Sequence, residues 1–298
     1  MGRRYDTISF LSDFGVRDEL VGVVKSVLRD LAPHATVIDL THGVAAFDIR
    51  AGSLALARAI PYVASGIVLA VVDPGVGTAR RAVAIEVGGG EGVLVGPDNG
   101  LLAPAVAIAG GAERAVVLTN ESYQLAAPGP TFAGRDVFAP AAAHLCNGVD
   151  LFELGEPVDP DVLVPGVVPL PRDDAGSIVC EVLWVDRFGN CQLNVGPDEV
   201  ESLGSRVQVS VGDLSGDPVV RVAARAVTFD DIGTGSVGLV TDSSGMLALA
   251  LARRSAADEL GLAAGDQVLL SSLGERDSGA IAVPVRLGSP SPGSAPVA

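Results

Sequence analysis

Continuous apolar runs that end in short polar loops containing glycine restrict the fold of this sequence more than any other feature. The runs at residues 7–11 and 66–72 are followed by polar, glycine-containing segments at 12–15 and 73–77. A strand that is apolar at every position is buried on both faces, which is typical of parallel sheets. Between these runs, residues 18–31 carry apolar side chains at helical spacing. The alternation predicts an α/β N-terminal domain with a largely parallel sheet.

The second half of the chain has a different pattern. Short β segments dominate beyond a stretch rich in proline and acidic residues, and helix is sparse. This pattern predicts a small all-β, barrel-like C-terminal domain. We therefore expect an α/β substrate-binding domain at 1–160, a linker at 161–176, a β-barrel domain at 177–287 and a disordered tail at 288–298.

Composition narrows the functional classes. The net charge of -16 argues against a nucleic-acid partner, because phosphate binding depends on Lys and Arg. No apolar run reaches the roughly 18 residues of a membrane span, so no membrane partner is expected. The three cysteines show no disulfide or metal spacing, so we expect reduced thiols, a cytoplasmic location and no metal. A small-molecule substrate fits best.

Acidic residues follow the predicted strands, where α/β sheets bind ligands. Asp13, Asp73 and Asp98 lie in such loops, and Arg80 follows Asp73 across a glycine-containing turn. Carboxylates there bind sugar hydroxyls or orient water, but each also suits a helix cap or an Asx-turn. The loop lacks the Lys of a P-loop and the spacing of a dinucleotide site, so phosphate binding is not supported.

A series of short motifs resembles the S-adenosyl-L-methionine hydroxide adenosyltransferases, which are related to the fluorinase and chlorinase enzymes. The motifs occur in order through both predicted domains. They are Phe10-Leu11-Ser12-Asp13-Phe14-Gly15, Ile38-Asp39-Leu40-Thr41-His42, Val71-Val72-Asp73-Pro74-Gly75-Val76-Gly77, Gly96-Pro97-Asp98-Asn99-Gly100, Thr131-Phe132-Ala133-Gly134-Arg135-Asp136 and Asp186-Arg187-Phe188-Gly189-Asn190.

The resemblance implies a homotrimer in which the α/β domain of one subunit and the barrel of its neighbour enclose the substrate. No cofactor is implied, since S-adenosyl-L-methionine is itself the substrate. The roles that the resemblance implies are ribose binding by Asp13, an aromatic wall at Phe47, ammonium pairing by Asp186, adenine contacts by Phe188 and Asn190, and methionine carboxylate contacts by Ser243 and Ser244. The alternatives are that both Phe residues belong to the core and that the others only shape turns.

The nucleophile implied by the resemblance is water. Hydroxide-using members have an Asp, Arg and His set around the water, and halogenases replace the Asp with Tyr; this chain keeps Asp73 and Arg80. The resemblance therefore implies hydrolysis to adenosine and L-methionine by in-line attack at the 5′ carbon. Ala133 occupies the position of the family His and cannot accept a proton, so weakened catalysis is expected. The alternatives are a halide-dependent, chlorinase-like adenosyltransferase, and a non-catalytic protein that binds S-adenosylmethionine or adenosine.

Overall fold

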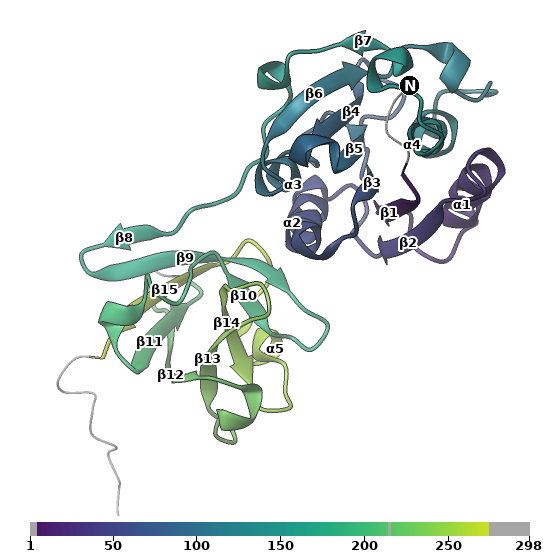
Figure 1. Cartoon of the computed structure of the whole chain (residues 1–298). Helices are drawn as coiled ribbons and strands as arrows, with labels where there is room; N and C mark the ends of the chain where they lie inside the picture. The colour runs from purple at the N-terminus through teal and green to yellow at the C-terminus, as the bar shows by residue number, and fades with distance from the viewer. Residues whose placement is uncertain (1–4, 214–215, 274–298) are drawn as a thin grey trace, which may run out of the picture. The chain divides into compact units, whose positions relative to one another are not determined.

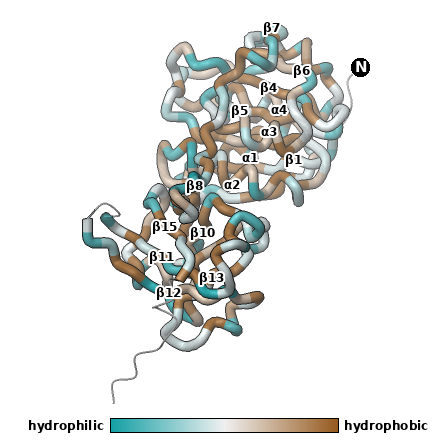
Figure 2. Tube along the Cα trace, turned by 90° about the vertical axis from the view of Figure 1, so that its left-hand side faces the viewer, coloured by the Kyte–Doolittle hydropathy of each residue, from teal (hydrophilic) through white to brown (hydrophobic). Residues whose placement is uncertain are grey.

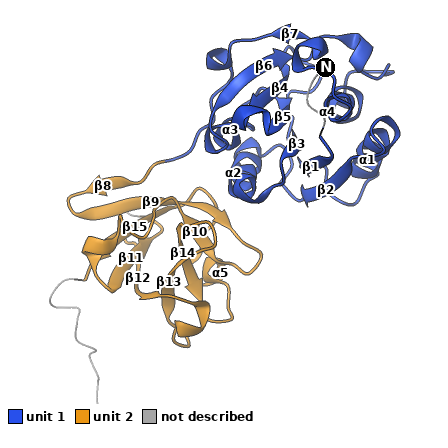
Figure 3. Ribbon diagram, viewed as in Figure 1, with its two compact units in different colours: residues 1–169 blue, residues 170–298 orange. Residues whose placement is uncertain are grey.

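The chain consists of two compact units, residues 1–169 and 170–298, which are coloured separately in Figure 3. The computed structural model describes residues 5–213 and 216–273. The division falls inside the segment predicted as a linker, 161–176, and the predicted tail at 288–298 lies outside the described residues.

The first unit is built on a mixed sheet whose parallel part carries the loops of interest (Figure 1). The strand order is β2 (Thr36–Thr41), β1 (Thr7–Ser12), β3 (Gly66–Val71), β5 (Gly92–Pro97), β4 (Ala82–Val87), β6 (Ala112–Val117) and β7 (Glu156–Pro157). Strands β2, β1, β3 and β5 pair in parallel, whereas β4, β6 and β7 are antiparallel to their neighbours. The prediction of an α/β domain with a largely parallel sheet is confirmed.

Helices cover both faces of this sheet (Figure 1). They are α1 (Leu20–Leu31) and α4 (Ala139–Cys146) on one face and α2 (Ile49–Ala59) and α3 (Ala103–Ile108) on the other. Strand β3 is buried along its whole length, and its side chains alternate between the two layers. Ile67 and Leu69 pack with α1 and α4, and Val68 and Ala70 pack in the cluster that contains α2 and α3 residues. This double burial explains why the strand is apolar throughout.

The second unit is a closed β-barrel, as predicted. Its strands close in the order β9 (Ser177–Val185), β10 (Cys191–Leu193), β14 (Leu247–Leu251), β13 (Val237–Thr241), β12 (Val219–Ala226), β11 (Arg206–Val211) and β15 (Gln267–Ser272), with β15 pairing back to β9. Neighbouring strands are antiparallel except for β12 and β13. Strand β8 (Arg172–Asp174) extends β9 as a hairpin, and α5 (Ala256–Leu260) follows β14.

The barrel interior is filled by aliphatic side chains. Val182, Val207, Val209, Leu249 and Leu270 are completely shielded from solvent. Figure 2 shows hydrophobic residues concentrated along the strands of both units. No helix in the described residues is long and apolar enough to cross a membrane.

Short helical turns connect the main elements. A π-helical turn at Gly134–Phe138 leads directly into α4. Turns of 3-10 helix lie at Ile60–Tyr62, Glu121–Tyr123, Leu151–Leu154, Pro160–Val162, Glu201–Leu203 and Phe229–Asp231.

Candidate functional site

The carboxyl ends of β1 and β3 place Asp13 and Asp73 at the same edge of the sheet. These strands pair in parallel with Ser12 opposite Val71, and the Asp13 N–H donates to the Val71 carbonyl at 3.3 Å. The charge of Asp13 contributes to raising the pKa of Asp73, which indicates that the two carboxylates are near each other. Two of the acidic residues predicted from strand ends therefore belong to one cluster.

Asp73 and Arg80 form a two-point ion pair within this cluster. The Arg80 Nε donates to Asp73 Oδ1 at 3.0 Å, and the Arg80 Nη2 pairs with Oδ2. Both side chains are largely buried, with 5% and 12% exposed for Asp73 and Arg80. The guanidinium also lies over the ring of Phe138, 5.4 Å from its centroid. Two-point contacts fix the plane of the carboxylate as well as its position.

Burial is the largest influence on Asp73 and raises its pKa above the ordinary value of 3.8. The charge and hydrogen bonds of Arg80 and the backbone N–H of Gly75 act in the opposite direction but do not cancel this effect. A buried carboxylate with a raised pKa is a better proton acceptor than an ordinary Asp. Asp73 is therefore suited to accept a proton from a bound water.

Asp13 supports an unusual backbone conformation at Phe47. The Phe47 N–H donates to Asp13 Oδ2 at 2.9 Å, and Phe47 has a φ of 69°, a region that bulky residues rarely occupy. Its side chain is 72% exposed. Phe47 is thus not a core residue, and backbone strain of this kind often marks a functional position.

The motif that contains Ala133 packs against the same edge of the sheet. The rings of Phe14 and Phe132 meet edge to face at 5.6 Å, and a Cβ on Gly134 would lie 2.9 Å from the Phe14 ring. Ala133 directly precedes the helical turn and offers no side-chain cap to it. Its methyl group is partly buried against the core that includes Phe14 and Phe132. The side chain of Ala133 therefore presents only an apolar surface.

His42 is buried behind the Asp13 loop. Its Nδ1 lies 2.8 Å from the Ser12 Oγ, and its carbonyl accepts the Gly15 N–H at 2.8 Å. The other ring nitrogen lies 3.2 Å from Asp39 Oδ1 without hydrogen-bond alignment. His42 thus links the two ends of the loop that carries Asp13.

Asp98 has a structural role. Its Oδ2 accepts the Arg81 Nε at 2.7 Å, and its Oδ1 accepts the Val164 N–H at 2.8 Å. Arg81 also donates to the carbonyl of Val162. These hydrogen bonds attach the start of the predicted linker to the α/β unit. Both carboxylate oxygens of Asp98 are used in this way, so we do not group Asp98 with Asp13 and Asp73.

In the barrel unit, Asp186 organises the turn between β9 and β10. Its Oδ1 accepts the N–H groups of Phe188 and Asn190 at 2.8 and 2.9 Å, and its Oδ2 accepts the Asn190 Nδ2 at 2.8 Å. Gly189 has a φ of 83°, and a Cβ there would lie 2.1 Å from the Ser255 Oγ. The side chain of Asp186 therefore stabilises a tight turn.

A second turn of the same design joins β13 to β14. Asp242 Oδ1 accepts the N–H groups of Ser244 and Met246 at 2.8 and 3.2 Å, and Gly245 has a φ of 82°. In both turns the backbone N–H of the Asp donates to the carbonyl of the last residue, and the N–H of the glycine donates to the carbonyl of the Asp. Strand β10, which follows the first turn, pairs antiparallel with β14, which follows the second turn.

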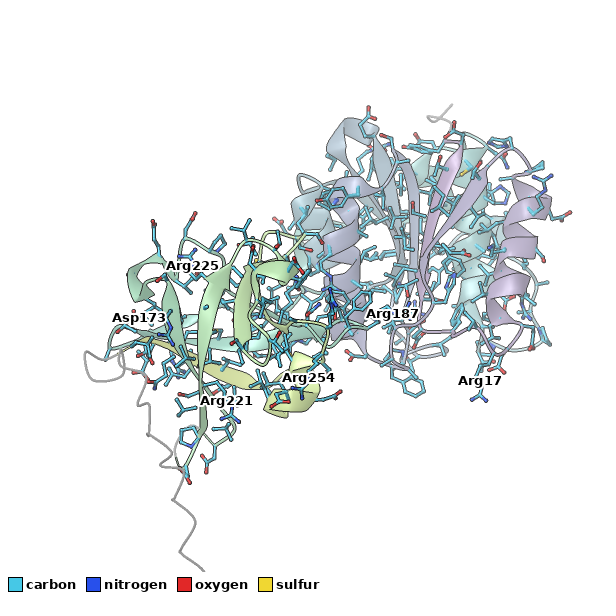
Figure 4. The ribbon with its side chains drawn as sticks, turned by 90° about the horizontal axis from the view of Figure 1, so that it is seen from below. Arg17, Asp173, Arg187, Arg221, Arg225 and Arg254 are labelled. Atoms are coloured by element: carbon cyan, nitrogen blue, oxygen red, sulfur yellow. The ribbon has the colours of Figure 1, made fainter. Side chains whose placement is uncertain are left out.

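Both turns line one pocket of about 440 Å³ in the barrel unit. Phe188, which is 70% exposed, and the half-buried Asn190 contribute to it, as do Ser243 and Ser244. The guanidinium of Arg187, labelled in Figure 4, lies over the Phe188 ring at 5.8 Å. The pocket also includes Trp184, Gln192, Val227, Phe229 and Asp242, for which the sequence motifs predict no role. The repeated Asp-x-x-Gly pattern at 186 and 242 is the signal that would have found Asp242.

The three cysteines and the acidic residues that the structure describes do not gather into a metal centre. Cys146, Cys180 and Cys191 are buried and unpaired, and burial raises the pKa of each thiol to about 12. No cluster of His, Cys, Asp and Glu suited to a metal ion occurs among the described residues. The candidate chemistry therefore rests on the Asp73 and Arg80 pair and on the barrel pocket.

The fold and these two clusters define a two-domain protein with an acidic strand-edge site in an α/β unit and an aromatic pocket in a small closed barrel. The family model described as SAM hydroxide adenosyltransferase N-terminal domain matches residues 8–155, and the model of the C-terminal domain matches residues 180–269. This chain belongs to the SAM hydroxide adenosyltransferase family.

Known relatives agree with this assignment along most of the chain. The (R)-S-adenosyl-L-methionine hydrolase of Salinispora tropica is 44% identical over 265 residues, which cover 89% of this chain and 97% of that protein. The hydrolase of the same name from Thermus thermophilus is 40% identical, with 88% and 98% covered. A fluorinase from Actinoplanes sp. is more distant, at 28% identity with 82% and 90% covered. The crystal structure of an uncharacterized conserved protein from Thermotoga maritima has a TM-score of 0.81 and 32% identity, with 89% and 99% covered.

Proposed function

We propose that this protein hydrolyses S-adenosyl-L-methionine, in the (R) form that its relatives' names specify, to adenosine and L-methionine. The observation that carries the proposal is the buried two-point pair of Asp73 and Arg80 at the carboxyl edge of the parallel sheet. In the halogenase relatives that the sequence resembles, a Tyr replaces this Asp. A carboxylate repels a halide and attracts a proton of water, which favours water as the nucleophile.

The proposed reaction is an in-line substitution. The oxygen of a water held by Asp73 and Arg80 attacks the 5′ carbon, while the carbon–sulfur bond breaks and its electron pair stays on sulfur. Asp73 takes the proton released by the water and passes it to solvent. Methionine leaves as a neutral thioether, so no metal or redox cofactor is required in this scheme. Arg80 keeps the carboxylate oriented toward the water.

The other site residues have binding roles in this proposal. Asp13 binds the ribose hydroxyls, and Phe47 provides an exposed aromatic wall beside it. The Asn190 Nδ2 is already used by Asp186, so its Oδ1 is the atom left to accept a hydrogen bond from the adenine amine. Phe188 stacks on adenine, Asp186 pairs with the methionine ammonium, and Ser243 and Ser244 bind the methionine carboxylate.

Assembly and location complete the proposal. We propose a homotrimer in which the α/β unit of one subunit and the barrel of a neighbour supply the two parts of the site, as the family resemblance implies. A cytoplasmic location fits three buried, unpaired thiols. Size-exclusion chromatography with light scattering tests the assembly, and a monomer with full activity would contradict a shared site.

A second candidate function is binding without turnover, and Ala133 favours it. The family His position here offers only a methyl group against an apolar core. Loss of a positioned general acid or base typically lowers a rate by roughly a hundredfold to ten-thousandfold. Tight binding of S-adenosylmethionine or adenosine without products would support this candidate.

The deciding experiment is incubation of the purified protein with S-adenosyl-L-methionine, with and without chloride, followed by chromatography of the products. Adenosine and methionine formed independently of chloride would support hydrolysis. Formation of 5′-chloro-5′-deoxyadenosine would instead support a halide-dependent transferase. If no product forms, calorimetric titration with adenosine separates a binding protein from a protein with no nucleoside site.

A further inference from the structure

The two matched turns of the barrel differ in what binds the second carboxylate oxygen of their Asp. In the first turn, the Oδ2 of Asp186 accepts the side chain of Asn190 from within the same turn. In the second turn, the Oδ2 of Asp242 accepts the Nε2 of Gln192, which belongs to β10. The second turn is thus attached to a strand that leads away from the first turn.

Gln192 is a rigid anchor for this bond. Its residue is only 3% exposed, and it pairs with Trp184 of β9 and Ala248 of β14. A hydrogen bond to an ionised carboxylate is stronger than one between neutral groups. The serines of the second turn, by contrast, are exposed and have no strand pairing of their own. Their position therefore depends on the anchor of Asp242.

We propose that the hydrogen bond from Gln192 to Asp242 is a positioning contact that holds Ser243 and Ser244 at a fixed place relative to the Asp186–Asn190 turn. This rests on the proposed function, in which Phe188 and Asn190 of the first turn contact adenine, Asp186 pairs with the methionine ammonium, and the second turn binds the methionine carboxylate. Gln192 and Asp242 then set the affinity for ligands that carry a methionine-like tail. Neither residue needs to touch the reacting atoms.

The prediction separates two kinds of ligand. Without the hydrogen bond between Gln192 and Asp242, the second turn samples other positions. A ligand with a methionine-like tail must then order this turn when it binds, which costs conformational entropy. We expect Gln192→Met to weaken S-adenosyl-L-homocysteine binding and raise the KM for S-adenosyl-L-methionine about tenfold, the cost of one lost hydrogen bond to a charged group. Adenosine affinity and kcat should stay close to those of the unchanged protein.

A conservative variant and a matched control test whether the contact itself is responsible. In Asp242→Asn, the side-chain oxygen still accepts the turn amides, and rotation of the Gln192 amide presents an oxygen to the new NH₂ group. This variant should retain near-normal KM. Gln208→Met makes the same change on β11, outside the pocket, and should alter none of these values.

The outcomes divide clearly. If Gln192→Met weakens the binding of adenosine and of S-adenosyl-L-homocysteine equally, or changes neither affinity, Gln192 has no positioning role. Asp242→Ala and the double variant with Gln192→Met complete a double-mutant cycle. If the two residues act through one hydrogen bond, the effects of the single changes on S-adenosyl-L-homocysteine affinity must be strongly non-additive.

A measurement without ligand keeps this test independent of the proposed function. Hydrogen exchange should become faster at the Ser244 and Met246 amides in Gln192→Met, while the Phe188 and Asn190 amides keep their protection. Unchanged exchange at Ser244 and Met246 would contradict the inference. Faster exchange in a protein that binds neither ligand would uphold the anchoring and refute the proposed function instead.

Discussion

The guanidinium of Arg80 donates two hydrogen bonds to the carboxylate of Asp73, and both side chains are largely buried. Burial and the Arg80 charge act on Asp73 in opposite directions, and burial has the larger effect. Asp73 is thus fixed in orientation and yet more basic than an ordinary Asp. These two properties suit a group that orients a water and takes its proton.

The first prediction concerns the replacement of Asp73. Asp73→Asn retains the size of the side chain but cannot take a proton, so kcat should fall about a hundredfold to ten-thousandfold. Adenosine affinity should change little, because Asp13 and the barrel pocket make the nucleoside contacts in the proposal. Steady-state kinetics and calorimetry measure the two quantities. A variant that keeps its kcat would remove Asp73 from the mechanism.

The second prediction concerns pH. Because the pKa of Asp73 is raised in the folded protein, the folded state binds more protons than the unfolded chain in the interval above 3.8. The contribution of Asp73 to stability therefore falls as pH rises through its folded pKa, while activity rises in the same interval as the base becomes ionised. Arg80→Met removes a charge that lowers this pKa, so the acid limb of kcat/KM should move to higher pH. The kcat/KM–pH profiles of the unchanged protein and of Arg80→Met test this. If the acid limb lies at the same pH in both, a group other than Asp73 controls it.

The third prediction concerns Ala133. Ala133→His restores a titratable side chain at the family position and should raise kcat by about a hundredfold or more if the chain is catalytically impaired. Ala133→Asn provides a polar control that cannot exchange a proton. Equal rates in all three proteins would show that the histidine is dispensable here.

The fourth prediction concerns the strained backbone at Phe47. Phe47→Gly relieves a positive φ, whereas Phe47→Leu retains it, so the glycine variant should be about 1 kcal/mol more stable than the leucine variant. Both variants lose the aromatic ring and should bind adenosine more weakly. Urea denaturation and calorimetry test the two effects. A leucine variant as stable as the glycine variant would indicate that the positive φ carries no strain.

The fifth prediction concerns the buried pair of Ser12 and His42. His42→Leu leaves the Ser12 hydroxyl buried without this partner and should lower the free energy of unfolding by about 1–3 kcal/mol. Adding Ser12→Ala to His42→Leu should recover little of that loss, because the Ser12 Oγ also accepts the Phe14 N–H at 3.3 Å and this N–H then loses its acceptor. If the second change recovers most of the loss, the bond from Phe14 contributes little to stability.

The sequence by itself determined the α/β unit and much of the candidate site. The apolar run of β3 requires burial on both faces, and parallel strands bring the loops after them to one edge, so Asp13 and Asp73 were expected together. The motif around Ala133 is contiguous in the chain, so the side chain at this position is read directly from the sequence. These features depend on local pattern, which a linear sequence contains.

The tertiary structure decided the features that depend on pairing between distant segments. Strand β10 has three residues, and β14 is a short apolar run, Leu247–Leu251, whose pattern alone does not distinguish strand from buried helix. Their pairing closes the barrel and brings Gln192 to Asp242. Asp98 seemed equivalent to Asp13 in sequence, yet Arg81 and Val164 occupy its oxygens. Packing and strand register across the whole unit decide which hydrogen-bond donors lie beside each carboxylate. The role of a carboxylate therefore depends on the tertiary structure.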